Sequence, residues 1–308
     1  MNGTTKNIVF LILSTIAGAA MMWWIYRGFD VHTLAEFFGQ RSNYVWIILA
    51  LAAGVLANVL RALRWRMLLE SADIHISRRR SVELIFISYL INSVTPRLGE
   101  LTRSLLVQRG NSAVSTRALG TVVVEKLADV GCLLVVIALA VSLRWQNTVD
   151  LVQRMSEGLT LALPSYTFYV VIGCVVCLLV GLSFPLWRHI RRFLVNLWEG
   201  ITAILRLRSP LSFCTLCVGI WVCNFLQLYL LLPCYEVLTH LSLADLIHVF
   251  AAASVGVLLP TPAGAGPWHF AIVKTLTTVY HTTKGVAQSF ALISHLSLIH
   301  ISEPTRRV

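Results

Sequence analysis

The sequence predicts an all-α integral membrane protein, a polytopic helix bundle with two re-entrant broken-helix hairpins arranged as an inverted repeat. Composition is the first reason, because 57% of the 308 residues are hydrophobic and only 13% are charged, about half the charged fraction of a soluble domain. Four apolar runs reach the roughly 20 residues that a bilayer crossing needs, and two shorter runs end at prolines. The composition excludes a disordered chain, a secreted disulfide scaffold and a large catalytic domain outside the membrane.

The long apolar runs cover 8–26, 44–63, 167–187 and 211–235. A fifth run, 118–143, is equally long but carries three acidic or basic residues in its first half. The first run also fits a signal peptide with a cleavage site at 17–19. Its apolar stretch continues to Tyr26, however, and only Lys6 precedes it as a basic residue, so a retained anchor is favoured.

The two short apolar runs end at Pro96 and Pro260, and a second short segment with helical character follows each of them. Proline lacks a backbone donor and clashes with the preceding turn, so it ends or breaks a helix. The sequence therefore predicts two hairpins, 82–110 and 246–280, each of which enters and leaves the membrane on the same side.

Arginine placement predicts the orientation. Ten arginines lie between residues 61 and 117 and five between 188 and 208, and such connections stay in the cytoplasm. The connections 27–43, 144–166 and 236–245 contain few or no basic residues and are predicted to face outward. The N-terminus is then cytoplasmic in a multi-pass protein of the plasma (inner) membrane. The net charge of +11 indicates orientation rather than a nucleic-acid partner.

Equivalent elements recur along the chain. Those that start at 8, 44, 82 and 100 have counterparts at 167, 211, 246 and 268, a shift of 159 to 168 residues. Three full crossings separate equivalent elements, so the second copy has the inverted topology typical of transporters. The predicted units are a first repeat at 1–143, an external linker at 144–166 and a second repeat at 167–295 with a truncated last span. Hydrophobic segments of similar length align in this way even without a repeat, and that alternative stays open.

The end of the chain is predicted to be foreign sequence. Residues 296–307 match one translation frame of a common transposase sequencing adapter, and such segments are excluded from an interpretation of the fold. We assign 296–308 to the adapter and expect the natural protein to continue beyond His295. The alternative is a genuine polar tail.

The first hairpin carries polar residues that suit a lipid phosphate: Asn92, Arg97, Gly99, Glu100 and Arg103. Gly99 permits a tight turn, and Glu100 and Arg103 are three residues apart on one face of the next helix. A helix N-terminus with nearby arginines binds anions. The alternative is an ion pair between Glu100 and an arginine that stabilises the turn.

The fifth span contains Glu125, Lys126 and Asp129. The two carboxylates are four residues apart, share one face and are predicted to point into the protein. A carboxylate in lipid is costly, so pairing with Arg97, Arg103 or Lys126 is favoured. Proton coupling or cation recognition is the functional alternative.

The second span contains a stripe formed by Asn58, Arg61 and Arg64. These side chains either bind headgroups or extend to the headgroup region to keep their charge in water. Asn224 and Gln227, one turn apart in the 211–235 run, are predicted to hydrogen-bond between helices.

The second hairpin combines small residues with an aromatic start to its returning helix: Pro262, Gly264, Gly266, Trp268 and His269. Small residues let the backbone approach another backbone or a headgroup. His269 either titrates near neutral pH or serves as a hydrogen-bonding residue.

No motif predicts a catalytic residue, a metal or a cofactor. The cysteines include two C-x-x-C pairs, 174/177 and 214/217, inside apolar runs. An ionised thiolate is costly there, so helix packing is favoured over metal binding. The sequence has no nucleophile elbow, P-loop, zinc-protease motif or dinucleotide fingerprint, and an enzyme acting on its own is not predicted.

The polar and proline/glycine motifs of the two hairpins and the spans resemble those of the lysylphosphatidylglycerol synthase transmembrane region family, also called flippase-like domain proteins. The residues that carry the resemblance are Asn58, Arg61, Arg64, Asn92, Pro96, Arg97, Gly99, Glu100, Arg103, Glu125, Lys126, Asp129, Pro260, Pro262, Gly264, Gly266 and Pro267. The family commonly has a glycine where this chain has Ala263.

The resemblance implies a bacterial inner-membrane lipid translocase, similar to the membrane half of the multiple peptide resistance factor. It would move an anionic or aminoacylated phospholipid or a related lipid, with membrane phospholipids as partners. One alternative is an accessory membrane subunit of an envelope lipid or glycan pathway. Another is the membrane portion of a lipid aminoacyltransferase whose soluble domain is not in view. A homo-oligomer or an envelope-biosynthesis partner is compatible with each.

Overall fold

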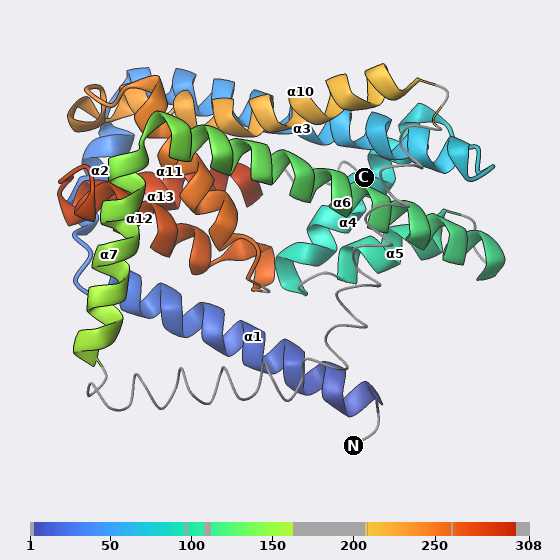
Figure 1. Cartoon of the computed structure of the whole chain (residues 1–308), viewed down its shortest axis with the longest axis horizontal. Coiled ribbons are helices and arrows are strands. Elements are labelled where there is room, and N and C mark those ends of the chain that lie inside the picture. Colours follow the sequence, from blue (N-terminus) through green and yellow to red (C-terminus); the bar gives the residue numbers. More distant parts are fainter. Residues whose placement is uncertain are drawn as a thin grey trace.

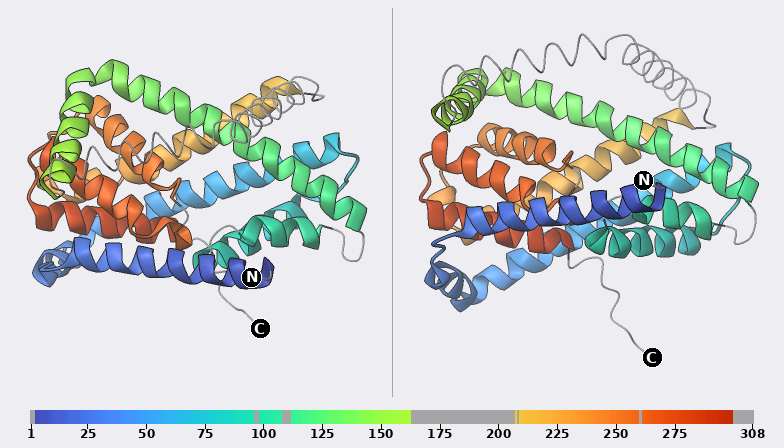
Figure 2. Two further views of the ribbon diagram at one scale, coloured as in Figure 1. Left: turned by 60° about the horizontal axis from the view of Figure 1, so that its bottom comes forward. Right: turned by 90° about the horizontal axis from the view of Figure 1, so that it is seen from below.

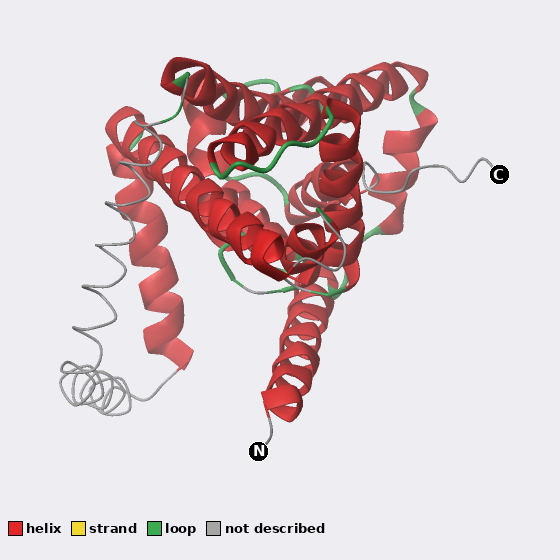
Figure 3. Ribbon diagram, turned by 90° about the vertical axis from the view of Figure 1, so that its right-hand side faces the viewer, coloured by secondary structure: helices red, strands yellow, loops and turns green. Residues whose placement is uncertain are grey.

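The computed structural model describes residues 3–95, 98–107, 112–162, 207, 209–259 and 261–299. The regular structure of these residues is helical throughout (Figure 3) and comprises eleven α-helices and three short 3₁₀ helices. The all-α prediction is therefore confirmed for the described part of the chain. The predicted span at 167–187 lies outside the described residues.

Among the described residues, two helices are long and apolar enough to cross a membrane. They are α3, Arg41–Ser71, with a mean hydropathy of 2.0, and the stretch Pro210–Cys234, with a mean hydropathy of 1.8. The second stretch consists of α10, Pro210–Tyr229, and the 3₁₀ helix η1, Leu232–Cys234. The helices α3 and α10 pack side by side along one edge of the bundle (Figure 1). The predicted runs 44–63 and 211–235 correspond to this pair.

The runs 8–26 and 118–143 also lie within single helices. These are α1, Gly3–Tyr26, and α6, Ser112–Leu143. Figure 2 shows α1 along one side of the bundle, where it packs against α12, Pro267–Thr278. Large apolar side chains on the outer surface remain exposed, such as Trp23 at 66% and Val135 at 67%. A surface of this kind suits hydrocarbon rather than water.

Each short apolar run forms one helix of a packed pair. The first pair is α4, Arg78–Val94, with α5, Leu98–Leu106, and the second is α11, Leu243–Gly256, with α12. The helix α4 begins earlier than predicted because the Ser77 hydroxyl accepts a hydrogen bond from the Arg80 amide, which is a typical N-cap. The breaks fall where the prolines predicted them.

The connections that were predicted to link spans contain further helices. The helix α2, Val31–Gly39, follows Asp30, whose carboxylate accepts a hydrogen bond from the His32 amide at 2.9 Å. The helix α7, Trp145–Ala162, occupies most of the predicted linker at 144–166. Neither helix has a sustained apolar run, so hydropathy alone did not reveal them.

The buried side chains of the described residues form two main clusters. The larger joins α10, η1, α11, α12 and α13, Lys284–Ile299, with parts of α1, α2 and α3. The smaller joins α3 and α4 with the start of α6, and it includes Trp65, which has no exposed surface. Because α3 contributes to both clusters, it connects the first helix pair to the second.

Candidate functional site

A buried ion-pair network links three helices of the first half. On α6, Glu125 accepts a bond from Arg64 of α3 at 3.2 Å and one from Arg103 of α5 at 2.6 Å. Asp129, one turn further along α6, accepts from Arg64 at 2.7 Å. The side chains of Arg64, Arg103 and Glu125 are at most 3% exposed. Buried charges are tolerated only when they are paired, and this network supplies the pairing.

The network confirms one sequence prediction and corrects another. Glu125 and Asp129 do share a face that points into the protein, since both contact Arg64. Arg64 does not extend to the headgroup region, because it is fully buried. The interpretation that the Arg64 side chain extends to the headgroup region was therefore wrong. Burial is possible because two carboxylates compensate for the loss of water around the guanidinium.

Aromatic and hydroxyl groups hold the network in place. The Arg103 guanidinium carbon lies 4.5 Å from the centre of the Trp65 ring, within the range of a cation–π contact. The Trp65 indole N–H donates to the Thr121 hydroxyl of α6 at 3.1 Å. Sequence reasoning missed Trp65 and Thr121, because neither is charged and their partners are far away in the chain.

A second ion pair lies beside the network. Lys126 contacts the Glu100 carboxylate at 2.9 Å, and Asn92 donates to the other oxygen of Glu100 at 3.2 Å. The Asn92 side-chain oxygen in turn accepts from the Gly99 amide at 2.8 Å. Glu100 thus pairs with Lys126, whereas the sequence alternative expected an arginine. Arg97 lies outside the described residues.

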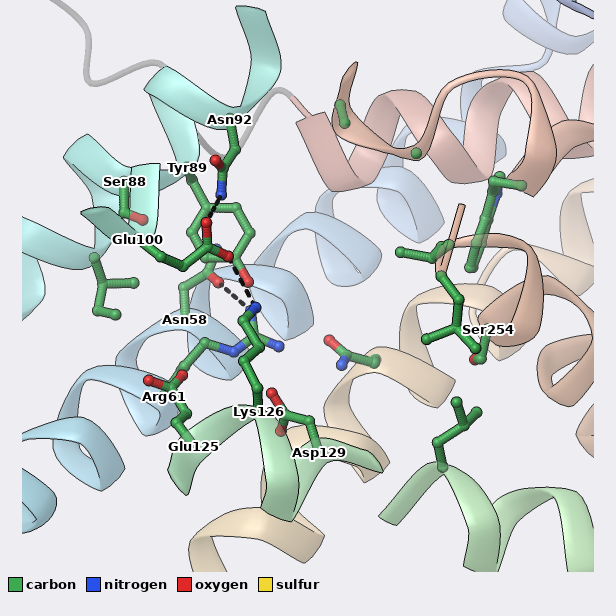
Figure 4. Close-up of a pocket in the computed structure, with 18 of the residues that line it drawn as sticks. Asn58, Arg61, Ser88, Tyr89, Asn92, Glu100, Glu125, Lys126, Asp129 and Ser254 are labelled. Atoms are coloured by element: carbon green, nitrogen blue, oxygen red, sulfur yellow. Dashed lines mark hydrogen bonds and ion pairs between the residues drawn. The ribbon is translucent and has the colours of Figure 1, made fainter. Parts of the chain in front are cut away.

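These groups border a cavity of about 760 Å³. Figure 4 shows Arg61 and Asn58 from α3, Glu100 from α5, and Lys126 and Asp129 from α6 on one side of it, with Ser254 of α11 across from them. The far side is mainly apolar and includes the following residues from α11, α12 and the segment between them: Phe250, Val257, Leu258, Leu259 and Trp268. The cavity therefore has a charged side and an apolar side, and both helix pairs contribute to it.

The predicted residues of the second hairpin separate into two groups. Gly264 and Trp268 line the cavity. Pro262 is the first residue of the 3₁₀ helix η3, Pro262–Gly264. Gly266 has a φ of +92° and lies against α1. Neither Pro262 nor Gly266 lines the cavity. A positive φ of this size favours glycine, so Gly266 shapes the turn that precedes α12.

His269 is fully buried and is not among the residues that line the cavity. Its ring lies 4.5 Å from that of His295. His295 lines the cavity and has its Nε2 atom 3.0 Å from the Ala263 carbonyl oxygen. Sequence reasoning treated His269 as a lone histidine and missed His295, because the two residues belong to different helices.

Polar residues of α10 also face the cavity. Asn224 and Gln227, predicted to hydrogen-bond between helices, both line it. The Gln227 side-chain oxygen has no hydrogen-bond partner within the described part of the chain. Cys217 accepts a bond from Arg64 at 3.4 Å. Within the described residues no group of three His, Cys, Asp or Glu side chains is placed to hold a metal ion. The cysteines at 174 and 177 lie outside the described residues.

The fold and the site define a class: a helical membrane protein with a cavity that is charged on one side and apolar on the other. The chain belongs to the family described as the lysylphosphatidylglycerol synthase TM region, which matches residues 9–300. The resemblance inferred from the motifs is thereby confirmed. The match concerns the transmembrane region of that synthase and includes no catalytic domain.

One curated relative is a UPF0104 membrane protein of Pyrococcus horikoshii, which is 23% identical to this chain over 129 residues. The aligned part covers 41% of this chain and 37% of the relative's length. No solved structure matches the chain.

Proposed function

We propose that this protein is a lipid translocase of the plasma membrane, with the cavity as the binding site for a phospholipid headgroup. The observation that carries the proposal is the division of the cavity into a charged side and an apolar side. A phospholipid has the same division, because its phosphate-bearing headgroup adjoins hydrocarbon chains. A soluble metabolite would not need the row of apolar residues at Val257, Leu258 and Leu259.

The proposed mechanism is alternating access. The pairs α4–α5 and α11–α12 act as two re-entrant hairpins of an inverted repeat, which enter from opposite sides and meet at the cavity. In transporters with such repeats, substrates bind near the midplane at the broken helices. The N-terminus is on the cytoplasmic side in this scheme. The buried network of Arg64, Arg103, Glu125 and Asp129 balances charge as the cavity changes the side to which it opens.

Asp129→Asn and Arg103→Ala are expected to slow lipid movement at least tenfold. Each variant removes one partner of a buried or half-buried ion pair at the cavity, and losing such a partner typically costs about 3–5 kcal/mol when the other charge stays buried. The measurement is the movement of fluorescent phospholipids between leaflets in proteoliposomes that contain the purified protein.

Glu83→Gln is the matched control, because Glu83 pairs with exposed Arg79 on α4 and does not line the cavity. The control is expected to match the wild type. Unchanged lipid movement in both test variants contradicts the proposed site. A wild-type protein that reconstitutes as a folded protein but moves no lipid contradicts the translocase function and favours an accessory subunit.

A further inference from the structure

Two cysteines from different helices lie together where α6 packs against α10. Cys217 of α10 is buried in a cluster with Leu68 of α3, and Cys132 of α6 packs against the same cluster. A side-chain hydrogen bond joins the two thiols. The C-x-x-C pattern of the sequence did not reveal this pair, because Cys214, its other member, is exposed on the opposite side of the helix turn.

A cationic donor lies against one of the two sulfur atoms. The Arg64 Nη1 atom donates to Cys217 Sγ at 3.4 Å and to the Asp129 carboxylate at 2.7 Å. Arg64 has no exposed surface, so its charge acts at short range on these neighbours. The thiolate is the nucleophile in cysteine oxidation, and a neighbouring arginine favours the thiolate over the thiol. Cys217 is therefore the nucleophilic member of the pair, with Cys132 as the second thiol within reach.

The pair is open on the outer surface of the bundle. Cys132 is partly exposed. Val135 and Leu139, three and seven residues further along α6 and thus on the same helix face, are exposed apolar side chains. A face of this kind suits hydrocarbon rather than water. An uncharged oxidant that dissolves in hydrocarbon can therefore approach the two sulfur atoms from the side of Cys132.

We propose that Cys132 and Cys217 are an oxidisable pair that forms a disulfide between α6 and α10, with an organic hydroperoxide as the oxidant. Cys217 loses its proton and its sulfur attacks the terminal peroxide oxygen. A sulfur–oxygen bond forms, the oxygen–oxygen bond breaks, and the alkoxide that leaves takes up the proton to become an alcohol. The products of this step are the alcohol and the Cys217 sulfenic acid.

The second step closes the disulfide. The Cys132 sulfur attacks the sulfur of the Cys217 sulfenic acid, so that a sulfur–sulfur bond forms and the sulfur–oxygen bond breaks. The hydroxide that leaves takes the Cys132 proton and becomes water. The two thiols are oxidised, and the hydroperoxide is reduced to an alcohol and water.

The disulfide would connect two sides of the cavity. Lys126 and Asp129 of α6 line it, as do Asn224 and Gln227 of α10. A covalent bond between these helices opposes any movement of one against the other. Oxidation therefore stops lipid movement by alternating access, a consequence that rests on the proposed function, whereas formation of the disulfide does not.

Oxidation of the full chain in proteoliposomes tests the disulfide directly, with cumene hydroperoxide as the probe. Mass spectrometry of a digest made without reductant is expected to show a peptide that links Cys132 to Cys217, and dithiothreitol is expected to remove it. Cys132→Ser is expected to lose the linked peptide and to leave a Cys217 sulfenic acid that dimedone traps. Cys223→Ser is the matched control, because Cys223 is a buried cysteine of the same helix, and the link is expected to persist.

The absence of the linked peptide from folded, oxidised wild-type protein overturns the proposal, as does a link between other cysteines or between two copies of the chain. Oxidised wild type is expected to lose lipid movement and to regain it with dithiothreitol, while Cys132→Ser is expected to keep it throughout. A disulfide that forms without slowing lipid movement overturns the effect on the cavity. Reduced wild type that moves no lipid contradicts the translocase function and this effect, and the linked peptide still decides whether the disulfide forms.

Discussion

Glu125→Gln is expected to lower the free energy of unfolding by about 3–5 kcal/mol, as observed when one partner of a buried ion pair is removed. Glu125 is the acceptor for both Arg64 and Arg103. The amide has nearly the same shape but no charge, so Arg103 loses its ion-pair partner among the described residues while it stays buried. Arg64 keeps Asp129. Unfolding of the purified protein in detergent, followed with temperature or denaturant, measures the effect.

Two comparisons make the Glu125 experiment specific. Glu83→Gln is the same chemical change at an exposed ion pair with Arg79, where roughly 0–1 kcal/mol is expected. The double variant Arg103→Leu with Glu125→Gln removes the orphaned cation and is expected to recover at least about 1 kcal/mol relative to the sum of the single effects. A Glu125→Gln protein as stable as the Glu83→Gln control would contradict the ionic role of the network.

Gly99→Ala is expected to disrupt the pairing of α4 with α5, with a loss of about 3 kcal/mol or more, at the upper end for overpacking. A Cβ atom at position 99 would lie 2.0 Å from the Ser88 carbonyl oxygen and 2.8 Å from the Asn92 side-chain oxygen. The first is a backbone atom, which cannot rotate away, so α5 must move. That movement shifts Glu100 and Arg103 out of their ion pairs.

Gly120→Ala is the control for Gly99→Ala. Gly120 is a helical glycine in α6, and a Cβ atom there meets no atom of the described residues within 4 Å. Alanine is a better helix former than glycine by about 1 kcal/mol, so this control is expected to be neutral or stabilising. The yield of monodisperse protein and its unfolding temperature distinguish the two variants. A Gly99→Ala protein that matches Gly120→Ala would show that α4 and α5 do not pack this closely.

Hydropathy predicted the long helices because a span is a local property. The runs 44–63 and 211–235 became α3 and α10, which pack together. The helices α2 and α7 were missed because they are amphipathic and their polar residues interrupt every apolar run. The inverted topology of the two halves stays a prediction, since it depends on the position of the membrane.

The polar residues were found by their unexpected position in apolar sequence, but their partners were not. The sequence favoured Arg97, Arg103 or Lys126 for the two carboxylates of α6, and only Arg103 among the described residues contacts one of them. Arg64 was missed as a partner because it lies 61 residues before Glu125 and 65 before Asp129. No local pattern encodes a contact over that separation.

By itself the sequence determined the membrane class, the helix breaks and the set of charged residues that must be compensated, because transfer free energy and proline geometry act locally. Only the tertiary structure decided which arginine meets which carboxylate. That choice depends on the packing of α3, α5 and α6 around Trp65. It pairs Arg64 with two carboxylates and leaves Arg61 without a carboxylate partner among the described residues. The charge left at the cavity is therefore a property of the packing, although every residue that produces it is visible in the sequence.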